Sequence, residues 1–580
     1  MRAYRLRFHH AWGTALFLLW WCPAMAAVTP TLEVNGDETV VTDNLKASLS
    51  LAGENCQANS SRRRIIQRQL RQQAGLAARA VGYYQARIDI DLQETDDCWH
   101  VALNVVSGPP VRVRDVSVSI EGMAASDPAF TSLIAETALQ PGAILQHNHY
   151  QSLRDGLLGL CERHGYFDCR LRQHQLMVDP DRNQADILLE LESGQRYVFG
   201  HFSLEQSVLR DSHARRFLRF QPGEPWNSEQ LLETQQALLG SGYYTTARLE
   251  RGNPEPGHDQ VPGTLYLTAR PKMAWLAGVG VSTDTGPRLR LGVENRYLND
   301  RGHRWRADGE ISPVNRSLSS SYEIPLRDPV RDRLVLSSAY RHEETDSAES
   351  EQIRLGASLI SSLESGWVLT RSLDYERENF TVGRQTTTTE LLIPGLQLQK
   401  IRSDHPVFPR RGWKLGTALR GTHPAISTTE RFLQGRLWAK GIVPLPRARL
   451  LARLEGGHTL VDDVTTLPAS VRFFAGGDSS VRGFDYQALG PRDAADDVVG
   501  GRSLLVGSLE ADFALTRHWH PAIFVDGGNA FNDSEELNPR VSAGAGVRWL
   551  SPLGPIRIDL ARAVDADRSW RLHLSMGPDL

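Results

Sequence analysis

The second half of the chain alternates apolar and polar residues with a period of two, and this pattern constrains the fold more than any other feature. In residues 449–455, 540–549 and 570–576, every second side chain is apolar and the charged side chains all fall on the opposite face. Because successive side chains of a β-strand point to opposite faces, the pattern predicts strands with one apolar and one polar face. We count sixteen such segments between Trp275 and Gly577. An even number of strands, apolar toward lipid and polar toward a watery lumen, predicts an antiparallel transmembrane β-barrel over residues 273–580.

Composition alone suggests a large soluble protein. The 580 residues are 41% hydrophobic and 23% charged, and the mean hydropathy is −0.35. These values argue against a bundle of apolar transmembrane helices. A net charge of −3 argues against general nucleic-acid binding, which needs clustered basic charge. A soluble β-sandwich with one solvated face is the alternative to the barrel, but the alternation continues to the C-terminus without helices to cover the sheet.

The N-terminus has the pattern of a secretory signal peptide. Arg2, Arg5 and Arg7 precede a short apolar stretch over residues 11–21, and Ala24-Met25-Ala26 fits the small-residue cleavage site. A retained membrane anchor is the alternative, but the apolar stretch is short for one. We therefore expect residues 1–26 to be a signal peptide and the mature protein to be exported.

The first half contains a threefold repeat. Its markers are Gly82-Tyr83-Tyr84, Gly165-Tyr166-Phe167 and Gly242-Tyr243-Tyr244, each after an amphipathic helical stretch and before an extended segment. Glycine can end a helix in the left-handed conformation without a Cβ penalty. Each unit reads β-α-α-β-β over roughly 80 residues, and we place the units at 27–108, 109–194 and 195–272.

Four cysteines remain after removal of the signal peptide: Cys56, Cys98, Cys161 and Cys169. An even number in an exported chain favours disulfides, and four cysteines allow three connectivities. Pairing Cys56 with Cys98 and Cys161 with Cys169 keeps each bridge inside one repeat, and it is the pairing that we predict.

The longest segment between predicted strands, residues 460–501, holds the most specific motif of the chain. It contains Arg472-Phe473-Phe474-Ala475-Gly476-Gly477 and then Ser480 followed by Val481, Arg482, Gly483 and Phe484. A connection of about 40 residues is too long to be filler. Acidic residues follow on the next predicted strands, with Glu510 on the lumen-facing parity and Asp526 in Phe524-Val525-Asp526-Gly527-Gly528.

These motifs resemble the outer-membrane insertase superfamily that includes BamA, TamA and the two-partner-secretion transporters. The three N-terminal units resemble its periplasmic POTRA domains, and residues 481–484 resemble its V-R-G-F/Y motif. The resemblance implies a loop that folds into the lumen, where Arg482 meets Glu510 and Asp526. An arginine between two carboxylates makes charge-assisted and geometrically specific hydrogen bonds. An exposed loop cation and generic lumen acids are the alternatives.

The first and last strands are candidates for a lateral seam. The predicted first strand, 275–284, contains Gly278 and Gly280, and the last contains Leu574 before Gly577-Pro578. Proline cannot donate a ladder hydrogen bond, so we expect the pairing between these strands to fail near the end of the chain. An ordinary barrel closure with a loose tail is the alternative.

Catalytic and cofactor motifs are not supported. Gly477-Asp478-Ser479 mimics an esterase block, but it lacks the strand-then-helix context and a convincing histidine partner. No phosphate-binding glycine motif occurs. We expect no enzymatic activity, no cofactor and no bound metal.

The whole mature chain is most similar to the TamA branch, the outer-membrane subunit of the translocation and assembly module. The resemblance implies an insertase in the cell outer membrane with its POTRA domains in the periplasm. Its expected partners are unfolded outer-membrane protein clients such as autotransporters, outer-membrane lipid, and a TamB-like inner-membrane-anchored protein, with no nucleic acid. The alternatives are a two-partner-secretion-type polypeptide transporter and a passive pore with periplasmic binding domains.

Overall fold

The structure is a computed structural model that describes residues 29–580 except 95–97, 384, 426–430, 552–553 and 565–569. The predicted signal peptide, 1–26, lies outside the described residues. The described strands form three three-stranded sheets and one sixteen-stranded sheet. The chain divides into two compact units whose boundary falls inside the third repeat: Met1–Val198 with Pro225–Ser228, and Phe199–Glu224 with Glu229–Leu580.

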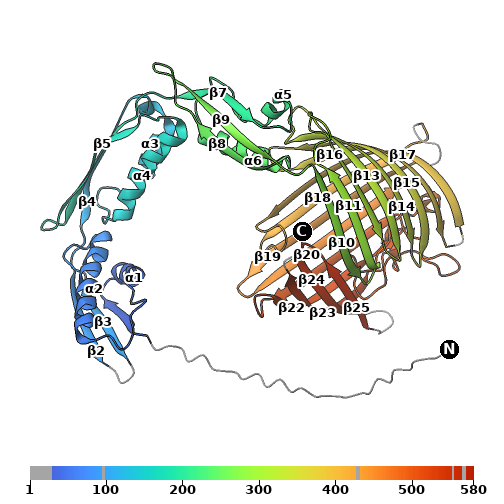
Figure 1. Cartoon of the computed structure of the whole chain (residues 1–580). Helices are drawn as coiled ribbons and strands as arrows, with labels where there is room; N and C mark the ends of the chain where they lie inside the picture. The colour runs from blue at the N-terminus through green and yellow to red at the C-terminus, as the bar shows by residue number, and fades with distance from the viewer. Residues whose placement is uncertain (1–28, 95–97, 384, 426–430, 552–553, 565–569) are drawn as a thin grey trace, which may run out of the picture. The chain divides into compact units, whose positions relative to one another are not determined.

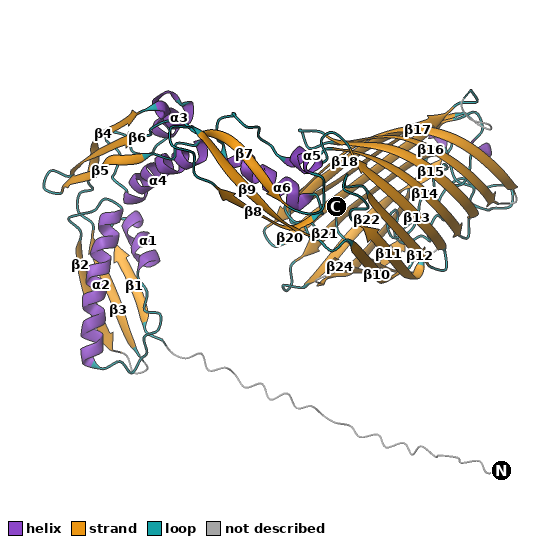
Figure 2. Ribbon diagram, turned by 45° about the horizontal axis from the view of Figure 1, so that its top comes forward, coloured by secondary structure: helices purple, strands orange, loops and turns teal. Residues whose placement is uncertain are grey.

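The three small sheets share the element order β-α-α-β-β and the same strand order, in which the last strand lies between the first and the middle strand. In the first two sheets, the first strand runs parallel to the last. The first sheet has the order β1-β3-β2, with β1 parallel and β2 antiparallel to β3. Its elements are β1 (Thr31–Gly36), α1 (Thr39–Ser48), α2 (Ser60–Ala80), β2 (Arg87–Glu94) and β3 (Trp99–Val106). Figure 2 shows both helices on one face of this sheet, where α2 buries Ile66, Leu70 and Ala74 against Leu103 and Val105.

The second and third sheets, β4-β6-β5 and β7-β9-β8, repeat this order. The second unit consists of β4 (Arg112–Glu121), η1 (Met123–Ser126), α3 (Pro128–Ala135), α4 (His147–His164), β5 (Arg170–Asp179) and β6 (Gln184–Glu192). The third consists of β7 (Val198–Glu205), α5 (Asp211–Ala214), η2 (Arg215–Phe217), α6 (Ser228–Gly240), β8 (Tyr244–Arg251) and β9 (Gln260–Ala269). No helix in the described part of the chain is both long and apolar enough to cross a membrane.

The predicted helix-ending glycines take the left-handed conformation. Gly82, Gly165 and Gly242 have φ values of 96°, 82° and 77°. Gly165 is the C-cap of α4, and its N–H donates to the carbonyl of Cys161. The disulfides join Cys56 to Cys98 and Cys161 to Cys169. The second bridge therefore ties the end of α4 to the segment that leads into β5.

The predicted sixteen-stranded antiparallel sheet is confirmed. Each strand pairs with its neighbour in sequence, from β10 to β25, and the sheet curls into a barrel (Figure 1). The first strand is Met273–Ser282, two residues earlier than predicted at both ends. The strands are β10 (Met273–Ser282), β11 (Gly286–Asn295), β12 (Arg304–Ile311), β13 (Asn315–Pro325), β14 (Asp332–Glu344), β15 (Ala348–Ser362), β16 (Val368–Val382), β17 (Gln385–Ser403), β18 (Gly412–Thr422), β19 (Phe432–Leu445), β20 (Ala448–Leu460), β21 (Ser503–Phe513), β22 (Trp519–Phe531), β23 (Arg540–Ser551), β24 (Gly554–Ala563) and β25 (Trp570–Met576).

The two faces of the barrel wall differ as the alternation predicts. Trp275 and Val279 on β10 are 80% and 87% exposed, and the outward positions of other strands are also large and apolar. Charged residues at the alternating, inward-facing positions, such as Asp526 on β22 and Arg548 on β23, are buried. An apolar outer face around a polar interior is the arrangement that a bilayer requires of a barrel.

A loop of residues 461–502, which we call the lumen loop, connects β20 to β21. It carries one short helix, η3 (Val464–Thr466); the other short helix of the barrel, η4 (Ser534–Glu536), follows β22. Phe473, Val481 and Leu489 of the loop are buried against Leu504 and Val506 of β21. The loop therefore packs against the inner wall.

Candidate functional site in the lumen and at the barrel seam

Arg472 and two backbone bridges hold the shape of the lumen loop. The Arg472 side chain donates to the carbonyls of Thr465, Leu467 and Val499, at 2.6, 2.9 and 2.9 Å. Phe473 bridges Gly501, and Ala475 bridges Leu489. Because one buried guanidinium satisfies three loop carbonyls, the loop needs little regular secondary structure to stay ordered.

The tip of the loop presents Arg482 to the wall. Its Nε and Nη2 donate to the two carboxylate oxygens of Asp526, at 2.7 and 2.9 Å, in a bidentate pair. Nη1 donates to Glu510 at 2.8 Å and to Asp559 at 2.9 Å. The guanidinium carbon lies 3.4 Å from the centroid of the Phe524 ring. The structure thus places Arg482 between the two predicted acids, Glu510 and Asp526, and adds a third.

The register of the strands explains why these acids converge. Ser508 of β21 lies opposite Asp526 of β22, so Glu510, two residues further on, shares its face and lies diagonally beside it. Asp559 lies on β24 opposite Gly546 of β23. A Cβ at Gly546 would clash with the Asp559 carboxylate and the Ile558 carbonyl, so only glycine leaves space for the Asp559 side chain.

A second arginine, Arg548, completes the group, and sequence reasoning missed it. Its Nε donates to Glu510 at 2.9 Å and its Nη2 to Asp559 at 3.2 Å. Asp559 was missed as well, because the sequence pattern gave no sign that it faces Arg482. We call the following residues the Arg482 cluster: Arg482, Ser508, Glu510, Asp526, Arg548 and Asp559.

The Arg482 cluster is a buried ionic network. Asp526, Asp559 and Arg548 are at most 3% exposed. Burial alone would lower the pKa of Arg482, but the carboxylates of Asp526, Glu510 and Asp559 raise it above its ordinary value, so the guanidinium stays charged. Each of the three carboxylates is paired with at least one of the two arginines, so the network can fix the loop to the wall.

The seam between β10 and β25 lacks the ladder that joins the other neighbouring strands. The sheet order runs from β10 to β25, and no register between these two strands occurs in the described part of the barrel. Gly278 and Gly280 pair with Arg290 and Arg288 of β11. Gly577, also predicted at the seam, donates its N–H to the carbonyl of Pro555 near the start of β24, the neighbour of β25 on the side away from β10. Leu574 does lie at the seam, because its N–H donates to the Thr283 hydroxyl at 3.2 Å.

The residues after β25 turn into the lumen, where Asp579 is buried. Arg449 of β20 donates to Asp579 at 3.0 Å and to Asp512 of β21, and Arg557 of β24 also binds Asp579. The Arg449 guanidinium carbon lies 3.4 Å from the centroid of Phe408. This second ionic network holds the tail away from the path that would extend β25 along β10.

Two family models match the chain. Residues 298–579 match the Omp85 superfamily domain, and residues 31–107 match the model described as POTRA domain TamA domain 1. The second and third sheets share the strand order of the first but are not covered by that POTRA match.

Curated relatives include two outer membrane protein assembly factors and a SAM50-like protein. The outer membrane protein assembly factor BamA of Nitratidesulfovibrio vulgaris is 31% identical over 146 residues, 23% of this chain and 18% of that protein. BamA of Neisseria meningitidis serogroup B is 22% identical over 553 residues, 83% of this chain and 68% of that protein. A SAM50-like protein of Schizosaccharomyces pombe is 23% identical over 59% of this chain and 81% of its own length.

Among solved structures, BamA from Haemophilus ducreyi lacking POTRA domains 1–3 superposes with a TM-score of 0.56 at 16% identity. The match covers 95% of this chain and 99% of that chain. At this identity the similarity establishes the fold.

Proposed function

We propose that this protein, whose residues 298–579 match the Omp85 superfamily domain and whose residues 31–107 match a POTRA domain model, is an outer-membrane barrel protein that assists the assembly and secretion of autotransporters and other outer-membrane proteins. The barrel supplies a seam at which client strands are templated, and the N-terminal units capture the unfolded client. The incomplete closure between β10 and β25 is the observation that carries the proposal.

The physical basis is the cost of unpaired backbone in lipid. Each unsatisfied N–H or C=O group in hydrocarbon costs several kcal/mol, so a client strand gains by pairing with an open edge. β10 offers such an edge, because β11 occupies only one of its sides. The net free energy comes from folding and burial of the client.

The three small sheets support the capture step. Each has two edge strands, β1 and β2 in the first, β4 and β5 in the second, and β7 and β8 in the third. An extended client segment can add to such an edge by β-augmentation. We propose that all three units are POTRA domains, at 27–108, 109–194 and 195–272, and that they lie in the periplasm.

Within the superfamily we propose a TamA-type role, in which a TamB-like inner-membrane-anchored protein binds the N-terminal units. The match of residues 31–107 to the first POTRA model of TamA supports this role. A two-partner-secretion-type transporter would use the lumen as a conduit for its client. A passive pore would need neither the seam between β10 and β25 nor the motif of residues 481–484. The lumen loop, fixed by the Arg482 cluster, favours the insertase over the passive pore. The three small N-terminal sheets favour it over a two-partner-secretion-type transporter, which typically has two such units.

The test is to lock the seam. In Thr283→Cys/Leu574→Cys, whose parent residues are in contact at the seam, oxidation is expected to stop assembly of a co-expressed autotransporter, and reduction to restore it. A matched pair, Val279→Cys/Leu289→Cys, spans the intact β10–β11 ladder, and its oxidation is expected to leave assembly unchanged. Normal client assembly by a fully crosslinked seam would refute the lateral template and favour a pore or a scaffold.

A further inference from the structure

The carboxylate of Asp478, at the tip of the lumen loop, contacts both sides of the seam. Its Oδ1 accepts from the Thr283 hydroxyl at 2.7 Å and from Nδ1 of His573 at 2.6 Å. Its Oδ2 accepts from the Ser282 hydroxyl at 2.8 Å. Ser282 ends β10, Thr283 follows it, and His573 is on β25. One loop residue therefore bridges the first and last strands of the barrel.

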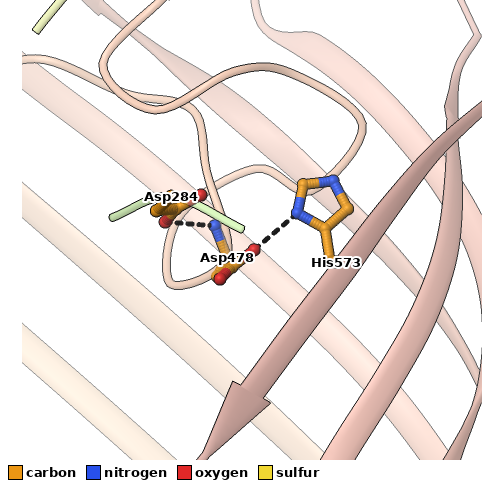
Figure 3. A group of neighbouring side chains, drawn as sticks. All are labelled: Asp284, Asp478 and His573. Carbon is orange, nitrogen blue, oxygen red and sulfur yellow. Dashed lines mark hydrogen bonds and ion pairs between the residues drawn. The ribbon is translucent and has the colours of Figure 1, made fainter. Parts of the chain in front are cut away.

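Figure 3 shows Asp478 between Asp284 and His573. The Asp478 N–H donates to the Asp284 carboxylate at 2.8 Å. The Asp478 and His573 side chains are only 8% and 6% exposed. Charge-assisted hydrogen bonds in such a site are stronger than exposed ones because water does not compete for the donors.

The loop tip also fixes the tautomer of His573. The Gly483 N–H donates to Nε2 of His573 at 2.8 Å, so Nε2 is the acceptor nitrogen and Nδ1 carries the proton that Asp478 accepts. His573 also lies opposite Asp559, a member of the Arg482 cluster, in the β24–β25 ladder. The seam contacts and the Arg482 cluster thus share one loop tip.

A metal ion is the obvious alternative occupant of this site. Asp284, Asp478 and His573 can bring one ligand atom each within 4.8 Å of one another. However, a histidine ligand needs a free lone pair, and His573 uses Nε2 to accept and Nδ1 to donate. The geometry therefore fits a hydrogen-bonded bridge better than a metal site.

We propose that Asp478 is a clasp that holds the seam closed. The side chain replaces the missing backbone ladder with hydrogen bonds to Ser282 and Thr283 on one side and to His573 on the other. Opening the seam requires the clasp to release one strand, and the loop that carries it is anchored by Arg482 only four residues away. This inference rests on the proposed function for the use of the open seam, but seam opening itself is measured without a client.

The clasp also responds to pH through Asp284. Burial, and then the Asp478 charge, raise the pKa of Asp284 to about 7. The titratable groups that face it are Asp478 and Tyr486 of the lumen loop and His573 of β25. In an open, solvated seam the Asp284 pKa returns toward 3.8. Asp284 therefore binds a proton more tightly in the closed seam than in the open one. The resulting stabilisation of the closed seam is complete below about pH 4 and is lost as the pH rises to about 7.

The clasp is tested in the purified full chain in detergent. Nitroxide labels at Val281→Cys and Met576→Cys, two outward-facing positions near the seam, report the distance between β10 and β25. Asp478→Ala is expected to increase the population with long, broad distances at least about tenfold, as expected for loss of one or more charge-assisted hydrogen bonds. Ser479→Ala, at an exposed neighbour on the same loop, is expected to leave the distribution unchanged.

Two outcomes would overturn the clasp. One is an unchanged distance distribution in Asp478→Ala with the barrel folded. The other is a wild-type seam that closes only when Zn²⁺ is added and opens with a chelator, which would assign the three residues to a metal. If the clasp holds but a locked seam still assembles clients, only the proposed function fails.

The pH response has its own comparison. Between pH 8 and pH 5, the closed population of the wild type is expected to rise, whereas Asp284→Asn keeps the hydrogen-bond acceptor without a titrating charge and is expected to stay closed throughout. The difference between the two profiles isolates Asp284 from His573, which both proteins retain. Identical profiles would remove Asp284 from the mechanism.

Discussion

Arg482→Ala is expected to destabilise the barrel by about 3–5 kcal/mol, as breaking a buried ion pair typically does. The substitution leaves Glu510 and Asp559 in a buried site paired with Arg548, and it removes the guanidinium that binds the buried Asp526. The buried carboxylates must then take up protons or water, and the loop tip detaches from the wall. The measurement is thermal unfolding of the purified barrel in detergent, together with assembly of a co-expressed autotransporter.

Two variants calibrate this result. Arg492→Ala removes an arginine of the same loop whose ion pair with Asp496 is exposed, and such surface pairs are worth about 0–1 kcal/mol. Arg482→Lys keeps the charge but loses the fork that binds Asp526 through two nitrogens, so we expect an intermediate loss. Wild-type heat resistance and full client assembly by Arg482→Ala would refute the role of the Arg482 cluster as a lock.

Arg449→Ala is expected to have a loss of similar size, about 3–5 kcal/mol, at the opposite end of the last strand. Arg449 is only 5% exposed in its side chain and stands between Asp512 and Asp579, both nearly fully buried. Without it, the tail after β25 loses one of its two arginine anchors, and only Arg557 remains on Asp579. Thermal unfolding measures the loss.

The control for Arg449 is Arg447→Ala, an exposed arginine two residues earlier, for which we expect a change of at most about 0.5 kcal/mol. A double-mutant cycle with Asp579→Asn separates the tail from Asp512. We expect the two substitutions to be non-additive, because both remove the same contact. Additive losses would mean that Arg449 acts through Asp512 and the Pro409 carbonyl rather than through the tail.

The barrel wall was predictable because its signal is local. Alternation along each strand fixes which residues face lipid, and the even strand number follows from counting such segments. Arg482, Glu510 and Asp526 could be singled out because the motif and the parity of neighbouring strands place them on one face. Disulfide pairing followed from the repeat, since each bridge joins cysteines of one unit.

Contacts that depend on barrel closure were not predictable. Asp478 and Ser282 are 196 residues apart in sequence, and Asp478 and His573 are 95 apart. The contacts of Asp478 with Ser282 and His573 depend on how far the last strand extends along the first before the tail turns inward. No local sequence pattern encodes this stagger between the two strands. Asp478 was therefore interpreted only as part of a false esterase block. Arg548 and Asp559 were missed for the same reason, because charged residues on lumen parity are common in any such wall.

The cysteines of both disulfides lie in the N-terminal half of the chain, so thiol oxidation and reduction affect only that half. Both disulfides lie before residue 170, and the sequence from 273 onward contains no cysteine. A reductant therefore acts on the first and second repeats while the barrel, its loop and its ionic networks keep every native contact. A cysteine introduced into the barrel wall therefore has no native thiol or disulfide beside it in the barrel sequence. One sample can be reduced in its N-terminal half while labels on the barrel strands are measured.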